Sequence, residues 1–271
     1  IIYYFFKKNF QKIIKKKIKN SLKIISDYFG KKISIKNFDD NLIIHDISHS
    51  WFNYKKIKKI KNYYYFSSLR KFGFYNLGGW CSLKFKKKLK ISENKLSNKL
   101  YKLRNEKYNL INNKLLYDNL INQNYLVKKF NNLEREIIKD KKIIQKKNIA
   151  NITNLNLTRI GKIRKKNYYY LKKKINSKYI IDLNLKKNET PLFFLLIFLN
   201  EKERNKIRNF LIRNKIFCPI HWKIKYDKFN NSNKLSKKTL SIPIDHRYNT
   251  SDMSFIINTF KRYKKSFLKT V

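Results

Sequence analysis

Short apolar runs alternate with stretches rich in lysine and asparagine along the first part of the chain. Residues 23–30 (KIISDYFG) and 41–46 (NLIIHD) each read as a buried strand, the first closed by Gly30 and the second ending in an acid. Residues 62–69 (NYYYFSSL) predict a third strand because aromatic side chains favour strands. Buried strands roughly 20 residues apart are typical of an α/β sheet.

The pattern then changes twice. Three of the chain's five glycines, Gly73, Gly78 and Gly79, follow the third strand, where they predict turns with positive φ or a close backbone approach. From residue 92 to 176, apolar residues recur at three-to-four spacing, which predicts helices.

A second α+β segment follows. Residues 177–185 (SKYIIDLNL) and 191–199 (PLFFLLIFL) read as strands, and 200–216 as a helix that opens at Asn200. The segment LSIPIDHRYNTSDM, from residue 240, predicts a strand or turn and then a last helix. We expect Thr250 or Ser251 to be the N-cap of that helix.

The composition permits a globular chain and raises the question of an anionic partner. The 271 residues are 42% hydrophobic and carry a formal net charge of +49, which would suit nucleic acid or an anionic membrane surface. However, arginine, the residue best suited to phosphates and base edges, accounts for only ten of the 66 basic residues. The lysines are also spread along the whole chain, so composition drift explains them better than a nucleic-acid site does.

Other features narrow the possible compartments and classes of protein. Cys81 and Cys218 match no zinc or disulfide framework, so we expect a reducing cytoplasm. The apolar run at 191–199 is far shorter than the roughly 20 residues needed to span a bilayer. The only methionine is Met253, which suggests that a piece before Ile1 is missing.

Two residues are candidates for a functional site. Asp46 ends the second strand, and Lys71 lies just beyond the end of the third, 25 residues later. Open α/β sheets bind ligands at the carboxyl ends of their strands, so we expect both side chains to line one crevice. Taken alone, Asp46 would be a turn or cap residue and Lys71 a surface lysine. The aromatic run from Tyr63 to Phe66 reads as buried strand in preference to a base-stacking platform.

Five ordered segments resemble the DegT-type (DegT/DnrJ/EryC/StrS) sugar aminotransferases. These enzymes have the fold type I architecture and use pyridoxal 5'-phosphate. IIHDISHSW is similar to the family's strand end, in which an Asp is followed three residues later by Gln or His. SSLRKFGFYNLGGW resembles its lysine segment. IRKKNYYYL, IRNFLIRNKIFCPIHW and LSIPIDHRYNTSDM resemble its later helix, strand and turn.

The resemblance implies a role for each matched residue. Asp46 would pair with the pyridinium nitrogen of the cofactor, and His49 would lie near its phenolic oxygen. Lys71 would bond to the cofactor aldehyde and later move a proton at the substrate carbon. Ser67 or Ser68 would bind the cofactor phosphate, and the choice between them is open.

The resemblance also implies an organisation and a reaction. Residues 1–145 would be the remainder of the cofactor-binding large domain, and 146–271 a linking helix with a small C-terminal domain. The activity would be amino transfer from an amino acid to a nucleotide-linked keto-sugar, by a cytoplasmic homodimer without metal or membrane. Such sugars serve in the biosynthesis of cell-surface polysaccharide and related products.

Some features depart from the family. Relatives have about a hundred further residues before this segment, as the resemblance implies, and their Gly-x-Asn-x-Arg motif is not recognisable here, although Arg104 and Asn105 occur together. Two alternatives therefore stay open: a catalytically inert relative, and a basic nucleic-acid-binding protein from an AT-rich genome. His45 and Ser50 could be structural, His221 belongs to the small domain, and His246 reads as a turn residue.

Overall fold

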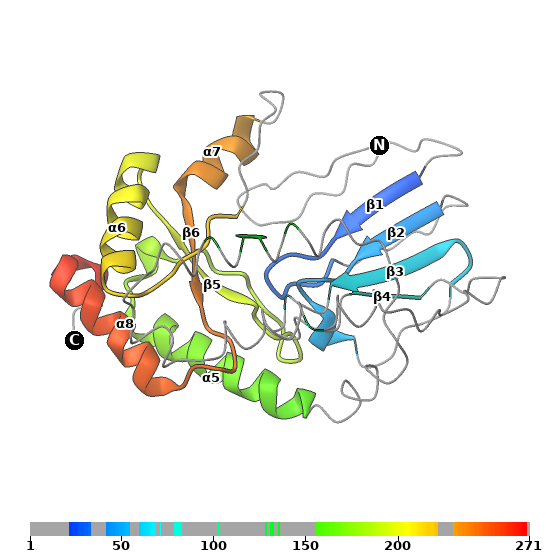
Figure 1. Ribbon diagram of the computed structural model, residues 1–271, viewed down its shortest axis with the longest axis horizontal. Helices are drawn as coiled ribbons and strands as arrows, with labels where there is room; N and C mark the ends of the chain where they lie inside the picture. The colour runs from blue at the N-terminus through cyan, green and yellow to red at the C-terminus, as the bar shows by residue number, and fades with distance from the viewer. Residues whose placement is uncertain are drawn as a thin grey trace. The chain divides into compact units, whose positions relative to one another are not determined.

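The computed structural model describes residues 22–33, 42–54, 60–68, 71, 79–82, 156–221 and 230–269, with a few isolated helical positions between 102 and 135 (Figure 1). The chain forms two compact units, which we describe separately. The first holds Ile1–Tyr64 and Leu157–Val271, and the second holds Tyr65–Asn156. The domain boundary predicted at 145/146 lies outside the described residues.

A parallel pair of strands forms the N-terminal part of the first unit. β1 (Leu22–Ser26) runs beside β2 (Leu42–Asp46), with Leu22 opposite Leu42 and Ser26 opposite Asp46. Side chains alternate across the sheet, so Ile25 and Ile43 are buried while Leu22 and Leu42 are exposed. The strands predicted at 23–30 and 41–46 are confirmed, and the first ends earlier than expected, at Ser26.

The third predicted strand is also confirmed. β3 (Tyr63–Ser68) buries Tyr63, Tyr65 and Ser67 and leaves the alternate residues half-buried, as a strand period of two requires. From Tyr65 onward it belongs to the second unit, where it pairs antiparallel with β4 (Gly79–Cys81). The strand order is β1-β2-β3-β4. The α/β class expected from the sequence is confirmed by these strands and the helices that follow.

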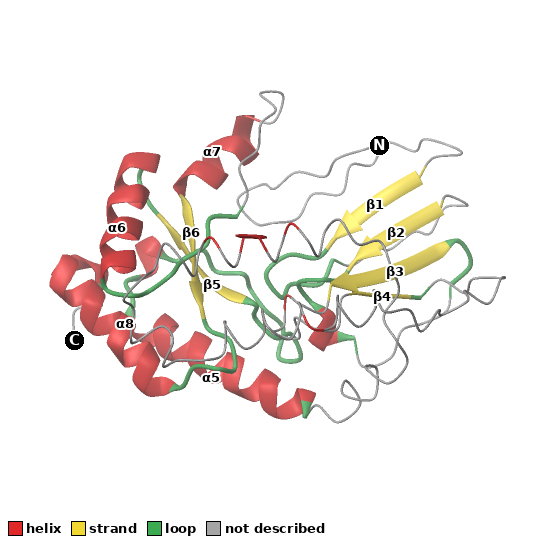
Figure 2. Ribbon diagram, in the orientation of Figure 1, coloured by secondary structure: helices red, strands yellow, loops and turns green. Residues whose placement is uncertain are grey.

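The C-terminal part of the first unit packs helices on a two-stranded antiparallel sheet (Figure 2). Its sheet pairs Phe193 with Pro243 and Ile197 with Thr239. α5 and α8 pack against each other, and α6 packs on α7, α8 and β6. The elements, in chain order, are α5 (Leu157–Lys174), β5 (Phe193–Ile197), α6 (Glu201–Arg213), α7 (Asn230–Lys238), β6 (Thr239–Pro243) and α8 (Thr250–Tyr263).

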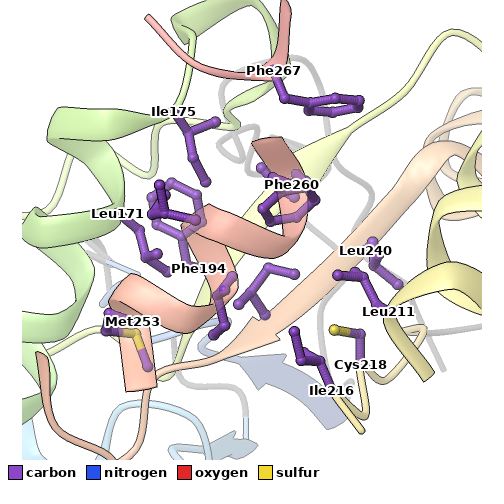
Figure 3. Close-up of a cluster of buried hydrophobic side chains, with 14 of the residues drawn as sticks. Leu171, Ile175, Phe194, Leu211, Ile216, Cys218, Leu240, Met253, Phe260 and Phe267 are labelled. Carbon is purple, nitrogen blue, oxygen red and sulfur yellow. The ribbon is translucent and has the colours of Figure 1, made fainter. Parts of the chain in front are cut away.

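One apolar core joins these elements, and Figure 3 shows its side chains converging from α5, α6, α8 and the two strands. Leu171, Phe194, Leu240 and Met253 have no exposed surface. Burying a side chain of this size stabilises the fold by roughly 1.5–3 kcal/mol. The labelled members of the core are Leu171, Ile175, Phe194, Leu211, Ile216, Cys218, Leu240, Met253, Phe260 and Phe267.

Two local expectations were wrong. Residues 177–185 form no strand: they contain the short 3-10 helix η4 (Ser177–Tyr179) and then irregular chain. The Asn176 side chain accepts a hydrogen bond from Lys178 N at 3.1 Å, and Asp182 accepts one from Asn184 N at 3.0 Å. Such local bonds compete with strand pairing because they satisfy the backbone in turns.

The last helix is capped one residue earlier than expected. Asn249, not Thr250 or Ser251, is the N-cap of α8, because its Oδ1 accepts from the amides of Ser251 and Asp252, and Asp252 accepts from Asn249 N in return. The Asn200 cap of α6 is confirmed, with Glu203 N donating to Asn200 Oδ1 at 2.8 Å.

Candidate functional site

Asp46 lies at the carboxyl edge of the parallel pair. Its backbone carbonyl accepts from Asp27 N at 2.9 Å, and its Oδ1 accepts from Ser48 N at 2.8 Å, which fixes the carboxylate at the start of the turn. In the part of the chain that the structure describes, its Oδ2 accepts no hydrogen bond. A half-buried carboxylate with one oxygen available at a strand end can accept a hydrogen bond from a ligand.

His49 lies one turn further along, buried with 5% of its surface exposed. Phe29 N donates to its Nδ1 at 3.3 Å. Because Nδ1 accepts this hydrogen bond, the neutral ring carries its proton on Nε2. The backbone of the β1 turn thus makes His49 a donor at Nε2.

Aromatic rings surround His49. Tyr28 meets it edge-on with ring centroids 6.2 Å apart, and the His221 ring lies 6.1 Å away at 76°. Burial raises the pKa of Tyr28, the Ser26 side chain lowers it through a hydrogen bond, and the charge of Asp46 raises it. Tyr28 therefore stays a neutral phenol beside the Asp46 carboxylate.

Sequence reasoning missed both of these neighbours. Tyr28 lies two residues beyond the end of β1, and the strand-end signal that pointed to Asp46 was not applied to this first strand. His221 was assigned to the small domain, yet it also contacts Phe29 and Phe193, with centroids 5.7 and 4.8 Å away. Its Nδ1 lies 2.9 Å from Ser241 Oγ, which holds the ring on β6.

A buried network on Asp27 holds the turn that carries His49. Asp27 is 2% exposed, and its Oδ1 accepts from Ile33 N at 2.8 Å and lies 2.9 Å from His45 Nε2. Its Oδ2 accepts from the hydroxyls of Ser50 and, at 2.8 Å, Tyr54. His45 and Ser50, which sequence reasoning left open as structural, thus support the site without occupying the strand edge.

His45 extends this network to the third strand. Its Nδ1 lies 2.6 Å from the Tyr63 hydroxyl. With Nε2–H donating to Asp27, Tyr63 donates to Nδ1, so every polar atom in the chain Tyr63–His45–Asp27 has a partner. A satisfied buried network of this kind is rigid.

Asn53 ties the same turn to a segment far along the chain. Its Nδ2 donates to Gly30 O at 2.5 Å, and its Oδ1 accepts from Thr190 N at 2.7 Å. Gly30 has φ 95°, and a Cβ there would lie 2.1 Å from Thr190 O, so only glycine fits. The loop that carries His49 is therefore held from both sides.

The remaining predicted residues belong to the second unit. Ser67 lies opposite Trp80 and Ser68 opposite Gly79. The Ser67 hydroxyl is fully buried and has no hydrogen-bond partner among the described residues, whereas Ser68 and Lys71 are half-buried. A buried hydroxyl without a partner can donate a hydrogen bond to an anionic group of a ligand.

The structure therefore brings Asp46 and His49 together at one strand edge in the first unit. Gly73 and Gly78 lie outside the described residues. The predicted approach of Asp46 and Lys71 to one crevice stays a prediction, because the two residues belong to different units.

A metal site receives no support in the described ranges, and the buried cysteine Cys218 is not a reactive thiol. No group of three His, Cys, Asp or Glu residues within them could hold a metal ion. Burial raises the pKa of Cys218 to about 12, so its thiol is unreactive. Among the helices described, none combines the length and the apolar character that a bilayer crossing requires.

Comparisons with known proteins gave matches among solved structures alone. No family model and no curated protein matches the chain. It is similar to the sugar aminotransferase CalS13 from Micromonospora echinospora, with 9% identity, a TM-score of 0.42 and coverage of 82% of this chain and 58% of that chain. It is also similar to a DegT DnrJ EryC1 StrS aminotransferase from Brucella abortus, with 13% identity, a TM-score of 0.46 and coverage of 89% of this chain and 63% of that chain.

A third similar structure is AtS13 from Actinomadura melliaura, with 9% identity, a TM-score of 0.48 and coverage of 88% of this chain and 65% of that chain. The chain thus spans about three fifths of the length of these structures. The first two are aminotransferases of the kind that the sequence resembles. At these identities, and with all three TM-scores below 0.5, the likeness carries no conclusion about this chain.

Proposed function

We propose that this chain is part of a pyridoxal-phosphate-dependent aminotransferase that moves an amino group from an amino acid to a keto-sugar carried on a nucleotide. The observation that carries the proposal is the pair Asp46 and His49: a strand-end carboxylate with Oδ2 available, and one turn later a buried imidazole whose proton is fixed on Nε2. Assembly as a cytoplasmic homodimer belongs to the same proposal.

Each of the predicted residues, taken by itself, has the chemistry that one group of this cofactor needs. Asp46 Oδ2 would accept a hydrogen bond from the protonated ring nitrogen, His49 Nε2 would donate to the phenolic oxygen, and the unpartnered hydroxyl of Ser67 would donate to the phosphate. When bound, pyridoxal phosphate supplies an electron sink for the carbon that bears the substrate amine.

This chain's own groups would then bind, orient and move protons. Asp46, whose Oδ1 is held by the amide of Ser48, would favour the protonated form of the ring nitrogen. Lys71 Nζ would take a proton from the substrate carbon that bears the amine and deliver it to the cofactor carbon on the other side of that nitrogen. The Asp27 network would keep the His49 turn in place during these steps.

Covalent attachment of the cofactor tests the proposal. The full-length protein is mixed with pyridoxal phosphate, reduced with borohydride, digested and analysed by mass spectrometry. We expect the added mass on the peptide that contains Lys71 and its loss in Lys71→Ala, while the exposed-surface control Lys178→Ala keeps it. A folded protein that carries no such mass on Lys71 would remove the proposal.

Amino transfer is measured separately. Asp46→Asn should retain attachment at Lys71 but lose most transfer from glutamate to a nucleotide-linked keto-sugar, because an amide cannot hold the ring nitrogen protonated. Attachment without transfer in the unmodified protein would identify a cofactor-binding relative that has lost the activity.

A further inference from the structure

Helix α5 has two chemically different faces. Its inner face buries Ile160, Arg164, Tyr168 and Leu171, and the last two belong to the main core. The outer face consists of exposed residues, including Lys162, Lys166, Tyr169 and Lys173. Figure 1 shows α5 in green beside α8.

The outer residues form a straight stripe. At about 100° per residue, Lys162, Lys166, Tyr169 and Lys173 lie within about 60° of one another around the helix axis. With a rise of about 1.5 Å per residue, the stripe is about 17 Å long, and Lys162 and Lys166 are about 6 Å apart along the axis. Tyr169 lies between two of the lysines and is 53% exposed.

These lysines differ from their neighbours on the same helix. Lys172 pairs with Asp182 at 2.7 Å, and Lys165 donates to Lys187 O at 2.6 Å, so both are used within the fold. Within the described ranges, Lys162, Lys166 and Lys173 make no ion pair. They point to solvent from a helix whose 18 residues include no acid.

Mutual repulsion of these lysines lowers the stability of the fold unless a bound anion offsets it. Lysines four apart on a helix repel each other by about 0.2–0.5 kcal/mol. α6 shows the usual alternative, since Glu201 and Glu203 occupy its first turn and Glu201 pairs with Arg204. α5 has no acid in its first turn, where the helix dipole favours one.

We propose that this stripe, Lys162, Lys166, Tyr169 and Lys173, binds single-stranded nucleic acid. Lysines spaced along one line can follow successive phosphates, and an exposed aromatic ring between them offers a face on which an unpaired base can stack. A duplex would present phosphates to the lysines but keep its bases away from Tyr169. The total charge of the chain does not distinguish these partners, whereas this arrangement does. The inference is independent of the proposed cofactor chemistry.

Anisotropy of a fluorescein-labelled oligouridylate, titrated with the full chain at several salt concentrations, tests the proposal. The variant Lys162→Ala/Lys166→Ala/Lys173→Ala should bind at least tenfold more weakly at low salt. Its salt slope should fall by about 2, since each phosphate neutralised on a single strand contributes about 0.7. The matched control Lys202→Ala/Lys206→Ala/Lys261→Ala removes the same charge from exposed positions on α6 and α8 and should bind like the unmodified chain.

Tyr169 provides the second measurement. Tyr169→Ala should weaken binding roughly five- to 150-fold, as the loss of about 1–3 kcal/mol of stacking requires, and Tyr169→Phe should restore most of it. Equal losses in the two lysine variants would overturn the proposal, because general charge would then explain binding. So would an unchanged affinity in Tyr169→Ala, or a stripe variant that loses binding to phosphatidylserine vesicles but retains oligouridylate. Circular dichroism melting confirms that each variant is folded.

Discussion

Asp27, the first residue after β1, and His45 of β2 are hydrogen-bond partners, with His45 Nε2 2.9 Å from Asp27 Oδ1 and both residues almost completely buried. Ser50, Tyr54 and the amide of Ile33 complete the shell around the same carboxylate. A buried charge is tolerated only when its hydrogen-bonding capacity is filled, and here four donors fill it.

Removal of this carboxylate should destabilise the first unit strongly. Asp27→Ala leaves His45 Nε2 and the hydroxyls of Ser50 and Tyr54 buried without their acceptor, so we expect a loss of about 3–5 kcal/mol. Urea denaturation followed by circular dichroism measures it. The control Asp182→Ala removes an exposed pair with Lys172 and should cost about 0–1 kcal/mol. A similar cost for both variants would contradict the role of Asp27.

Asn167 should prove to be structural, although it lies in a segment that resembles a family motif. Its Nδ2 donates to the carbonyl of Tyr248 at 2.9 Å and approaches those of Ile244 and Asp245 at 3.3 and 3.4 Å. Asn167→Asp replaces a donor with an acceptor that faces three carbonyls, so we expect a loss of about 2–3 kcal/mol in the free energy of unfolding. Asn258→Asp, at an exposed position of α8, should change it by less than about 0.5 kcal/mol.

Two glycines approach Thr190 from different sides and should respond in opposite ways to alanine. Gly30→Ala places a Cβ 2.1 Å from Thr190 O and forces a side chain into φ 95°, so we expect unfolding or a loss above about 3 kcal/mol. In Gly161→Ala the new Cβ lies 3.3 Å from Thr190 Oγ1 and 3.9 Å from its Cγ2. A shift of the Thr190 side chain by a few tenths of an ångström relieves this contact, and alanine is favoured within a helix by about 1 kcal/mol. Thermal melting of the two variants compares them directly. A tolerated alanine at residue 30 would show that the contact can relax.

The strands and helices of the fold could be predicted from the sequence where one period of hydrophobic residues dominates a segment. The runs that became β1, β2, β3 and β5 were placed within a few residues, and α5 lies within the three-to-four pattern at 92–176. The segment 177–185 misled because its apolar residues suit a strand, while Asn176 and Asp182 bond to nearby amides instead. α7 was not expected because its sequence, NNSNKLSKK, has little apolar content to reveal a helix.

The sequence predicted only part of the candidate site. Asp46 and His49 follow directly from a strand end, so local pattern places them. Tyr28 and His221 join them through contacts between β1, the β2 turn and a segment some 170 residues later, and no local period reports such contacts. The same holds for Asn53, whose partner Thr190 is 137 residues away.

The helix cap that the sequence misplaced can be tested directly. Asn249→Ala removes the acceptor of the Ser251 and Asp252 amides and should cost about 1 kcal/mol, with an upper limit of about 2 kcal/mol. Thr250→Ala should change stability by less than about 0.5 kcal/mol, because the first helical residue is not the cap. The reverse order in a denaturation experiment would restore the original assignment.

His246 should make stability depend on pH between neutral and mildly acidic conditions. Burial, the Arg164 charge and the Arg247 charge lower the pKa of its ring to about 4, and the charge of Asp245 opposes them by raising it. In the unfolded chain the pKa is about 6.5, so the unfolded state binds the proton more tightly. The stability that this neutral ring contributes is therefore complete above pH 6.5 and is lost progressively as the pH falls toward 4.

Denaturation at pH 7 and pH 5 measures this effect. After allowance for solvent screening, the unmodified chain should lose on the order of 1 kcal/mol more than His246→Gln over that interval. The glutamine variant retains a polar side chain that does not titrate, so the other histidines contribute equally to both proteins and cancel in the difference. If both proteins lost the same stability between the two pH values, the ring of residue 246 would not be held neutral by its burial and its cationic neighbours.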